Sequence, residues 1–162
     1  MNPAEYNRCV DLYSDAVFRF IYSNRKDEDE ARDAVQDAFE TLWRNVEKVE
    51  LAKAKSYLFS VAYHDMIDNI RKQKRIEQLQ EKHEYIPANR TEHYTGAKQL
   101  VEQGLERLPE IQKQVLMLRD YEGYDYKEIG NITGLNESQV KVYIFRARKT
   151  LKDFIGKTEN VL

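Results

Sequence analysis

The feature that most constrains this chain is the scarcity of residues that break a helix. Its 162 residues include six glycines and three prolines, and the longest stretch free of both runs from residue 4 to residue 86. Glycine and proline mark most turns, so the chain has too few of them for a β-sandwich of many short strands. Apolar residues recur three or four positions apart, which is the period of an amphipathic α-helix. The sequence therefore predicts an all-α protein.

Three amphipathic helices are expected in the first half of the chain, over about residues 3–23, 27–47 and 53–76. Asn24 and Asp27 lie just before the second segment, where a short polar side chain commonly caps a helix. Three such helices with short connections can enclose a small core. The apolar positions expected to face this core are Tyr6, Val10, Tyr13, Val17, Phe20, Ile21, Ala31, Val35, Ala38, Phe39, Leu42, Trp43, Val46, Leu58, Val61, Ala62, Met66 and Ile70.

A mostly polar segment separates this half from the rest of the chain. Apolar periodicity fades between residues 77 and 96, and the segment contains Pro87 and ends at Gly96. Such a composition is typical of a flexible linker. We therefore expect two small helical domains, over residues 1–76 and 97–162, joined by a linker over residues 77–96 that sets no fixed distance between them.

The segment Tyr126–Phe145 has the layout of a helix-turn-helix. Gly130 lies inside its first helix, where the missing side chain lets the second helix cross closely. Gly134 lies at the turn, where a positive φ costs glycine little. Asn136 is expected to cap the second helix, with Gln139 reaching back as in a capping box. The core positions expected around the turn are Ile129, Ile132, Leu135, Val140 and Ile144.

The outer face of the second helix of this motif combines cations with apolar groups. Its residues lie one or three positions apart, which makes them neighbours on one side of a helix. Cations bind phosphates or guanine edges and apolar groups meet thymine methyls, so the face suits the major groove of DNA. For the helix taken alone, an ordinary solvated cationic face is the alternative. The residues are Lys141, Val142, Phe145, Arg146 and Lys149.

Charge is distributed unevenly along the chain, although the net charge is only −2. Residues 1–50 hold 7 basic and 12 acidic side chains, residues 51–76 hold 6 and 2, and residues 138–157 hold 6 and 1. A nonspecific nucleic-acid coat would be basic throughout. The pattern instead predicts two separate phosphate-binding surfaces, with acidic surface left for a different partner.

Several classes of protein are disfavoured by what the sequence lacks. The one cysteine, Cys9, cannot form an intramolecular disulfide, and no run of about 18 apolar residues is present. A cytoplasmic protein without membrane insertion is therefore expected. His64 and Asp65 have the composition of a metal-binding pair, but no second histidine lies at ligand spacing. Since a glycine-rich phosphate loop is also missing, we expect no catalytic residue, no metal and no cofactor.

Two separate parts of the chain resemble one family. Residues 108–152 (LPEIQKQVLMLRDYEGYDYKEIGNITGLNESQVKVYIFRARKTLK) are similar to the −35-reading domain of bacterial sigma factors of the extracytoplasmic-function (ECF) group of the sigma-70 family. Residues 27–45 (DEDEARDAVQDAFETLWRN) and 53–75 (KAKSYLFSVAYHDMIDNIRKQKR) resemble that group's other conserved domain. The resemblance implies a sigma region 2-like helical bundle followed by a region 4-like helix-turn-helix.

This resemblance also implies a function and partners. An ECF sigma factor binds core RNA polymerase and directs promoter-specific transcription initiation by recognising −10 and −35 elements of promoter DNA. It is a monomer when free, is held by an anti-sigma factor, and supplies no active-site residue because the polymerase performs the chemistry. Two alternatives stay open: a homodimeric helix-turn-helix regulator of a palindromic site, with residues 1–85 sensing a ligand, and an adaptor that binds polymerase without opening DNA.

Matched positions assign residues to the −35 contact and to polymerase docking. The recognition-helix positions include Lys141, Val142, Phe145 and Arg146, and the positions that contact the DNA backbone are Arg119, Tyr126 and Lys127. Val142 stands where a serine or another small polar residue is commoner, so the −35 sequence read here is expected to differ. The resemblance assigns binding of core RNA polymerase to an acidic face of the second helix. Without the resemblance, an ordinary solvated acidic surface would be the expected interpretation. This face is Asp33, Gln36, Asp37 and Glu40.

The −10 contact is assigned to the third helix. In the family, a short loop or helix break at the positions of His64–Asp68 forms a pocket for a flipped base, and the bounding residues His64 and Asp68 are assigned to it here. An asparagine is usual where His64 stands, which leaves the preferred base of this pocket open. Tyr57 and Tyr63 are expected to stack on exposed bases, with core packing as the alternative for each. Phosphates are expected to bind the basic tail Arg71, Lys72, Lys74 and Arg75.

Overall fold

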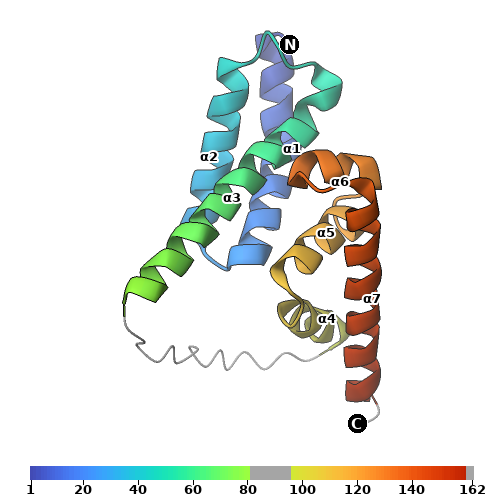
Figure 1. Cartoon of the computed structure of the whole chain (residues 1–162). Coiled ribbons are helices and arrows are strands. Elements are labelled where there is room, and N and C mark those ends of the chain that lie inside the picture. The colour runs from blue at the N-terminus through green and yellow to red at the C-terminus, as the bar shows by residue number, and fades with distance from the viewer. Residues whose placement is uncertain (81–95, 160–162) are drawn as a thin grey trace.

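A computed structural model describes residues 1–80 and 96–159, and within these residues the chain is helical with no strand (Figure 1). The first half contains α1 (Pro3–Arg25), α2 (Glu28–Arg44), the short 3-10 helix η1 (Leu51–Lys53) and α3 (Ala54–Leu79). The second half contains α4 (Ala97–Glu106), α5 (Glu110–Asp120), α6 (Tyr126–Thr133) and α7 (Glu137–Glu159). The prediction of an all-α protein is confirmed.

Caps at the helix starts fix where the first two helices begin. Asn2 and Glu5 form a reciprocal capping box at the start of α1. The Asp27 carboxylate accepts a hydrogen bond of 3.0 Å from the amide of Glu30 and so caps α2. Asn24, the other candidate, does not cap α2, because its amide donates to the Phe20 carbonyl inside α1.

Helices α1, α2 and α3 pack around one apolar core. The largest side chains that are fully buried in this half are Val17, Phe20, Ile21, Leu42, Leu58, Phe59 and Met66. Trp43 does not join them, contrary to the periodicity, and stays 51% exposed. It lies on the border of the apolar face of α2, between buried Phe39 and exposed Glu40, so the repeat alone does not determine on which side it falls.

The second half buries apolar side chains around the helix-turn-helix, and these belong to one core cluster with those of the first half. Val115 and Leu118 of α5, Ile129 and Ile132 of α6, and Ile144 of α7 are fully or almost fully buried. The lower half of α7 rests on α4 at Gly104, where an added Cβ would lie 2.4 Å from a methyl carbon of Leu151. Glycine therefore permits the close approach of α4 that holds α7 in place.

The two halves of the molecule pack against each other. Figure 1 shows α6 lying against α3, and α5 lying beside α1. The buried Tyr63 hydroxyl of α3 donates a hydrogen bond of 3.2 Å to Oε1 of Gln114 of α5. The rings of Phe59 and Tyr124 meet edge to face with centroids 5.4 Å apart. These contacts give the halves a definite arrangement in the structure, which the linker alone would not fix.

Ion pairs at the rim of this contact join the same two halves. Arg19 of α1 pairs with Glu122 at 3.1 Å, and Lys74 of α3 pairs with Glu110 of α5 at 3.7 Å. Of the linker predicted over residues 77–96, the first three residues continue α3, and residues 81–95 lie outside the described residues. The linker prediction therefore remains a prediction for its central part.

Candidate nucleic-acid and polymerase interface

The helix-turn-helix is built by local caps and by two glycines. The Asp125 carboxylate accepts from the amide of Glu128 at 2.8 Å and caps α6. Gly134 ends α6 with φ 82°, and its amide donates to the carbonyl of Gly130. A Cβ on Gly130 would lie 2.8 Å from the Leu135 carbonyl oxygen, so Gly130 makes room for the turn and not, as predicted, for the second helix itself.

The start of α7 follows the predicted capping box. The Asn136 side chain accepts from the amide of Gln139 at 2.8 Å, and the Gln139 side chain accepts from the amide of Asn136 at 3.0 Å. These two hydrogen bonds satisfy the backbone amides of Asn136 and Gln139 and so fix where α7 begins. Val140, Ile144 and Ala147 point into the core, with at most 2% of their surface exposed. The opposite side of α7 must therefore face solvent.

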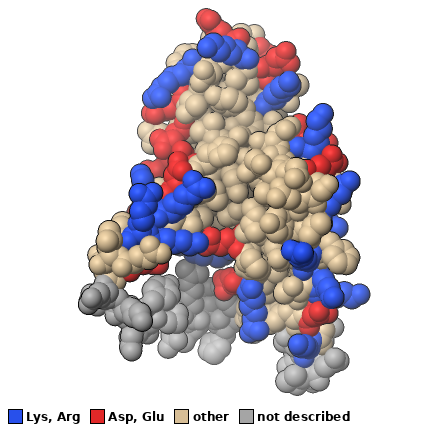
Figure 2. Space-filling view, in the orientation of Figure 1, with Lys and Arg blue, Asp and Glu red and all other residues tan. Residues whose placement is uncertain are grey.

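This solvent side of α7 is the predicted recognition face: Lys141, Val142, Phe145, Arg146 and Lys149 are all exposed. Phe145 leaves 70% of its surface in solvent and Val142 leaves 44%. Lys141 pairs with Glu137 at 3.7 Å, at the first turn of the helix. Lys and Arg side chains gather over α7 in Figure 2. The face thus combines two exposed apolar groups with flanking cations, a combination that fits the edges of base pairs and their phosphates.

Beside the recognition face, a cluster of cations surrounds the ring of Tyr126. The Arg119 guanidinium lies 4.7 Å from the ring centroid, and the Lys141 ammonium lies 5.6 Å from it. Arg119 is only half-exposed, because it also donates to the carbonyl of Tyr124 at 3.0 Å. Lys127, predicted with Arg119 and Tyr126 to contact the DNA backbone, is exposed. The structure brings this predicted group together at the start of α6.

Arg148 belongs to the same neighbourhood and was missed at the sequence level. Its guanidinium binds Asp120 of α5 at 2.6 Å, and this hydrogen bond raises the pKa of Arg148. The pair links α5 to the middle of α7. No local spacing signals it, since 28 positions separate the two residues in sequence.

The predicted −10 surface on α3 is divided between exposed and covered residues. His64, Asp68, Arg71, Lys72, Lys74 and Arg75 are exposed, whereas Tyr57 is half-buried. A group of cations toward the end of α3 is visible in Figure 2. The helix runs unbroken from Ala54 to Leu79, so the expected loop or break around His64–Asp68 is absent. Continuous helical hydrogen bonding, with no glycine or proline to interrupt it, accounts for this difference.

Tyr63 lies in a different environment from the one that base stacking requires. Only 4% of its surface is exposed, and its hydroxyl donates a hydrogen bond to the side-chain oxygen of Gln114 in α5. Burial raises the pKa of the Tyr63 hydroxyl. In this arrangement the packing alternative describes Tyr63.

The predicted docking face of α2 is exposed along its whole length. Asp33, Gln36, Asp37 and Glu40 all face solvent, opposite the buried Ala34, Ala38 and Leu42. Glu40 pairs with Arg44 one turn further on, at 3.8 Å. The acidic character extends to α3, where partial burial, followed by the charges of Asp37 and Asp68, raises the pKa of Asp65. This side of the bundle therefore favours a cationic partner.

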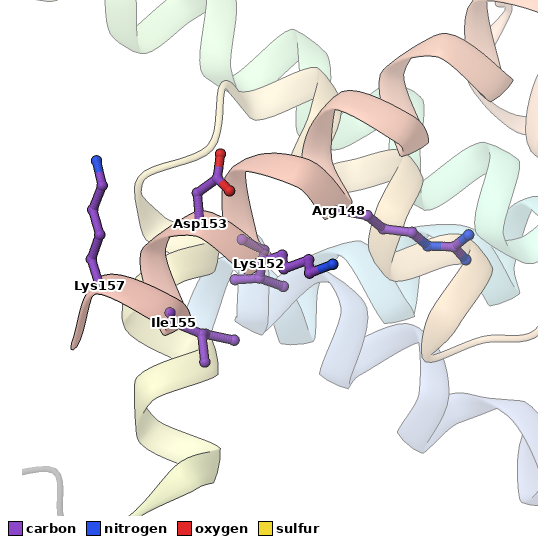
Figure 3. Close-up of a pocket in the computed structure, with 7 residues that line it drawn as sticks. Arg148, Lys152, Asp153, Ile155 and Lys157 are labelled. Carbon is purple, nitrogen blue, oxygen red and sulfur yellow. The ribbon is translucent and has the colours of Figure 1, made fainter. Parts of the chain in front are cut away.

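Two hollows lie on the part of the chain that the structure describes. One, of about 710 Å³, runs beside the last turns of α7 and is lined by residues of that helix alone, among them Lys152 and Ile155 (Figure 3). The other, of about 640 Å³, lies between α1 and the pair α4 and α5. Within the described residues no group of three or more His, Cys, Asp or Glu side chains is placed to hold a metal. No helix in the same part of the chain is long and apolar enough to cross a membrane.

Comparison with known protein families matches both halves of the chain. Residues 9–76 match the model of sigma-70 region 2, and residues 98–151 match the model of sigma-70, region 4. The two matches follow the order of the two helical regions. They leave out only the chain ends and the segment between the two halves.

Similar proteins extend over almost the whole chain. The chain is 29% identical over 153 residues to RNA polymerase sigma factor SigV of Bacillus subtilis. This alignment covers 93% of this chain and 91% of the relative. It is 29% identical over 157 residues to ECF RNA polymerase sigma factor SigM of the same organism, with coverages of 92% and 94%.

Solved structures share the fold. A chain from the co-crystal structure of the sigma factor RpoE with the anti-sigma factor NepR from Bartonella quintana has a TM-score of 0.76 at 22% identity, covering 93% of this chain and 96% of that one. A chain from the structure of CnrH with the cytosolic domain of CnrY has a TM-score of 0.68 at 21% identity, covering 96% and 90%. With the two matched family models in one chain and in this order, the protein belongs to the sigma-70 family, as a sigma factor of the ECF group.

Proposed function

We propose that this protein binds core RNA polymerase through α2 and directs it to promoters through α7 at the −35 element and α3 at the −10 element. The observation that carries this proposal is the presence, in one chain, of an exposed recognition helix and a separate bundle bearing both an acidic face and a basic helix end. A DNA-binding domain alone explains the first feature only. A sigma factor needs all three.

Reading of the −35 element falls to the exposed side of α7. Arg146 and Lys149 are suited to guanine edges or phosphates, and Phe145 and Val142 to thymine methyls. Arg119, Tyr126 and Lys127 contact the flanking backbone. Phosphate contacts of this kind fix the register of the helix in the groove, while the base contacts select the sequence.

Reading and opening of the −10 element falls to α3. Arg71, Lys72 and Arg75 hold the phosphates of the separated strands, and aromatic side chains stack on the exposed bases. Tyr63 joins this surface only after α5 has moved away from it. Binding to the polymerase therefore has two effects in our proposal: it separates the halves, and it holds them at the spacing of the two promoter elements, which converts two weak contacts into one strong contact.

The protein itself performs no chemistry in this proposal and acts in the cytoplasm with the polymerase. It is a monomer before it binds the polymerase. Because RpoE was solved with the anti-sigma factor NepR, and CnrH with the cytosolic domain of CnrY, we further propose that an anti-sigma factor binds this protein. Such a partner would compete with the polymerase for the surfaces described above.

In vitro transcription with purified core polymerase and genomic fragments tests the proposal. Addition of the protein should produce discrete transcripts whose mapped start sites share a −10 and a −35 element. The control is the double charge reversal Asp33→Lys with Asp37→Lys, which should lose polymerase binding while the exposed positions leave folding intact. Tight binding of the isolated protein to a palindrome as a symmetric dimer, without affinity for core polymerase, would establish the regulator alternative instead.

A further inference from the structure

Trp43 is the only tryptophan of the chain, and its exposure has no role in the fold. It leaves 51% of its surface in solvent on α2, although a side chain of this size and apolarity usually gains by burial. It follows Gln36 by seven residues and Glu40 by three, so all three lie on the same side of the helix. The acidic docking face therefore continues into an exposed indole ring.

The inner side of this ring is held firmly. Tyr6 of α1 packs against Trp43 edge to face, with ring centroids 4.9 Å apart. Tyr6 is itself fixed, because its hydroxyl donates to the Phe39 carbonyl at 3.1 Å and its ring meets that of Phe39 at 6.2 Å. A partner that binds the outer side of Trp43 thus meets a ring already held in one orientation, which lowers the entropic cost of binding.

The surroundings of the ring specify the charge of that partner. Asp33, Asp37 and Glu40 lie along the same side of α2. Two cations of this helix are already engaged, since Arg44 pairs with Glu40 and Arg32 pairs with Glu28. Carboxylates so placed repel an acidic surface and attract a basic one. Tryptophan is also the aromatic residue that binds a guanidinium face most strongly. Lysine and arginine both satisfy these conditions, and arginine is the one found more often over an aromatic ring.

We propose that Trp43 is the energetic centre of the docking face, and that an arginine of core polymerase stacks on its exposed ring while neighbouring basic side chains pair with Asp37 and Glu40. The inference rests on the proposed function and adds the residue on which affinity depends most. Interface energy concentrates in a few central aromatic or arginine residues surrounded by polar contacts of smaller effect. Trp43 has this character, whereas the carboxylates around it are solvated.

Affinity for core polymerase tests the proposal through two substitutions. Trp43→Ala should weaken binding by about 30-fold or more, and Trp43→Phe, which keeps an aromatic ring against Tyr6, by only a few-fold. The matched control is Tyr22→Ala on α1, another exposed aromatic residue of the bundle, which should leave the affinity unchanged. Thermal unfolding of each variant separates loss of docking from loss of folding.

A fluorescent analogue of tryptophan at position 43 provides a second measurement. Replacing Trp43 biosynthetically by 5-hydroxytryptophan gives a probe that is excited at wavelengths where the tryptophans of the polymerase do not absorb. Binding of core polymerase should protect this probe from quenching by acrylamide. Unchanged quenching in the complex would overturn the proposal, as would a Trp43→Ala variant that binds within threefold of the parent protein.

These outcomes separate the further inference from the proposed function. If Trp43→Ala binds normally and the double variant Asp33→Lys with Asp37→Lys does not, docking through α2 stands and the role of Trp43 is refuted. If both variants bind normally, docking through α2 is itself refuted. If neither the parent protein nor any variant binds core polymerase, the sigma-factor function fails.

Discussion

The two surfaces that we propose to read DNA differ in how much of each is exposed. The recognition face of α7 is exposed, and its direction is fixed by caps and glycines within a single motif. The surface of α3 proposed for the −10 element is exposed at its basic end, whereas Tyr63 is buried and hydrogen-bonded to Gln114 of α5. The comparison teaches that two surfaces proposed for the same task can differ in exposure, because one lies within a single motif and the other lies partly at the contact between the halves.

Disruption of the turn in the helix-turn-helix should have the largest effect. Gly130→Ala places a Cβ 2.8 Å from the Leu135 carbonyl oxygen, so backbone must move, and we expect a loss of about 3 kcal/mol in the free energy of unfolding of the second half. Thermal unfolding measures the loss. Gly156→Ala is the matched control, because no atom lies within 4 Å of its added Cβ, and it should not destabilise the protein. Equal stability of the two variants would mean that the close turn is not required.

Loss of a single recognition contact should come next. Arg146 is exposed, so Arg146→Ala should leave folding unchanged and weaken −35-dependent transcription by about 2 kcal/mol. Lys157→Ala removes a cation from the far end of α7 (Figure 3) and should leave transcription unchanged. Promoter titrations with mutated −35 elements measure both. If the Arg146→Ala variant were unfolded, Arg146 would be a structural residue, and its assignment to the recognition face would be wrong.

Weakening the contact between the halves should have a smaller effect. Unlike the two substitutions above, it should increase DNA binding by the free protein. Gln114→Ala leaves the buried Tyr63 hydroxyl without its acceptor, which should weaken the packed arrangement by about 1 kcal/mol. Binding of a single-stranded −10 oligonucleotide by the free protein should then increase by a few-fold, and the radius of gyration from solution scattering should rise. Asp153→Asn, which removes an exposed carboxylate near the end of α7 and away from the contact between the halves, is the control and should change neither quantity measurably. Equal oligonucleotide binding by Gln114→Ala and the parent protein would show that the contact does not mask the −10 surface.

The contrast between these surfaces also explains which features the sequence could predict. The periodicity, the Asn136 capping box, Gly134 and the outward face of α7 depend on residues within a few positions of one another, and the structure has each as expected. The burial of Tyr63, the Arg148–Asp120 pair and the packed halves depend on partners far apart in sequence. Periodicity shows which face of a helix is apolar but not which other helix covers it.

Trp43 and the unbroken α3 show two further limits of the same kind. A residue on the border of an apolar face can be buried or exposed, and the periodicity does not distinguish the two. For Trp43 the packing of α1 decides, because Tyr6 of α1 covers one side of the ring and 51% of the residue stays exposed. The helix break expected around His64–Asp68 came from the family resemblance and not from any helix-breaking residue in this chain.

The smallest effect is expected on the acidic side of the first half, and it depends on pH. Partial burial, with the charges of Asp37 and Asp68, raises the pKa of Asp65 above its ordinary value of 3.8, so the folded state carries a penalty when this carboxyl is ionised. The penalty is fully present above the raised pKa and is lost as the pH falls toward 3.8, because the folded state takes up the proton first. Asp65→Asn should therefore stabilise the protein at pH 7 by a few tenths of a kcal/mol, reduced by solvent screening, and the gain should vanish in acid.

Paired urea titrations of Asp65→Asn and the parent protein, at pH 7 and near pH 4, measure this difference. Asp11→Asn on α1, an exposed carboxylate outside this cluster, is the control and should show no such dependence on pH. If Asp65→Asn raised the free energy of unfolding by the same amount at both pH values, packing at this position, and not the charge of Asp65, would explain the gain. A gain confined to pH 7 would show that the bundle keeps a destabilising acidic surface, as expected if that surface is there to bind a cationic partner and not to hold the fold together.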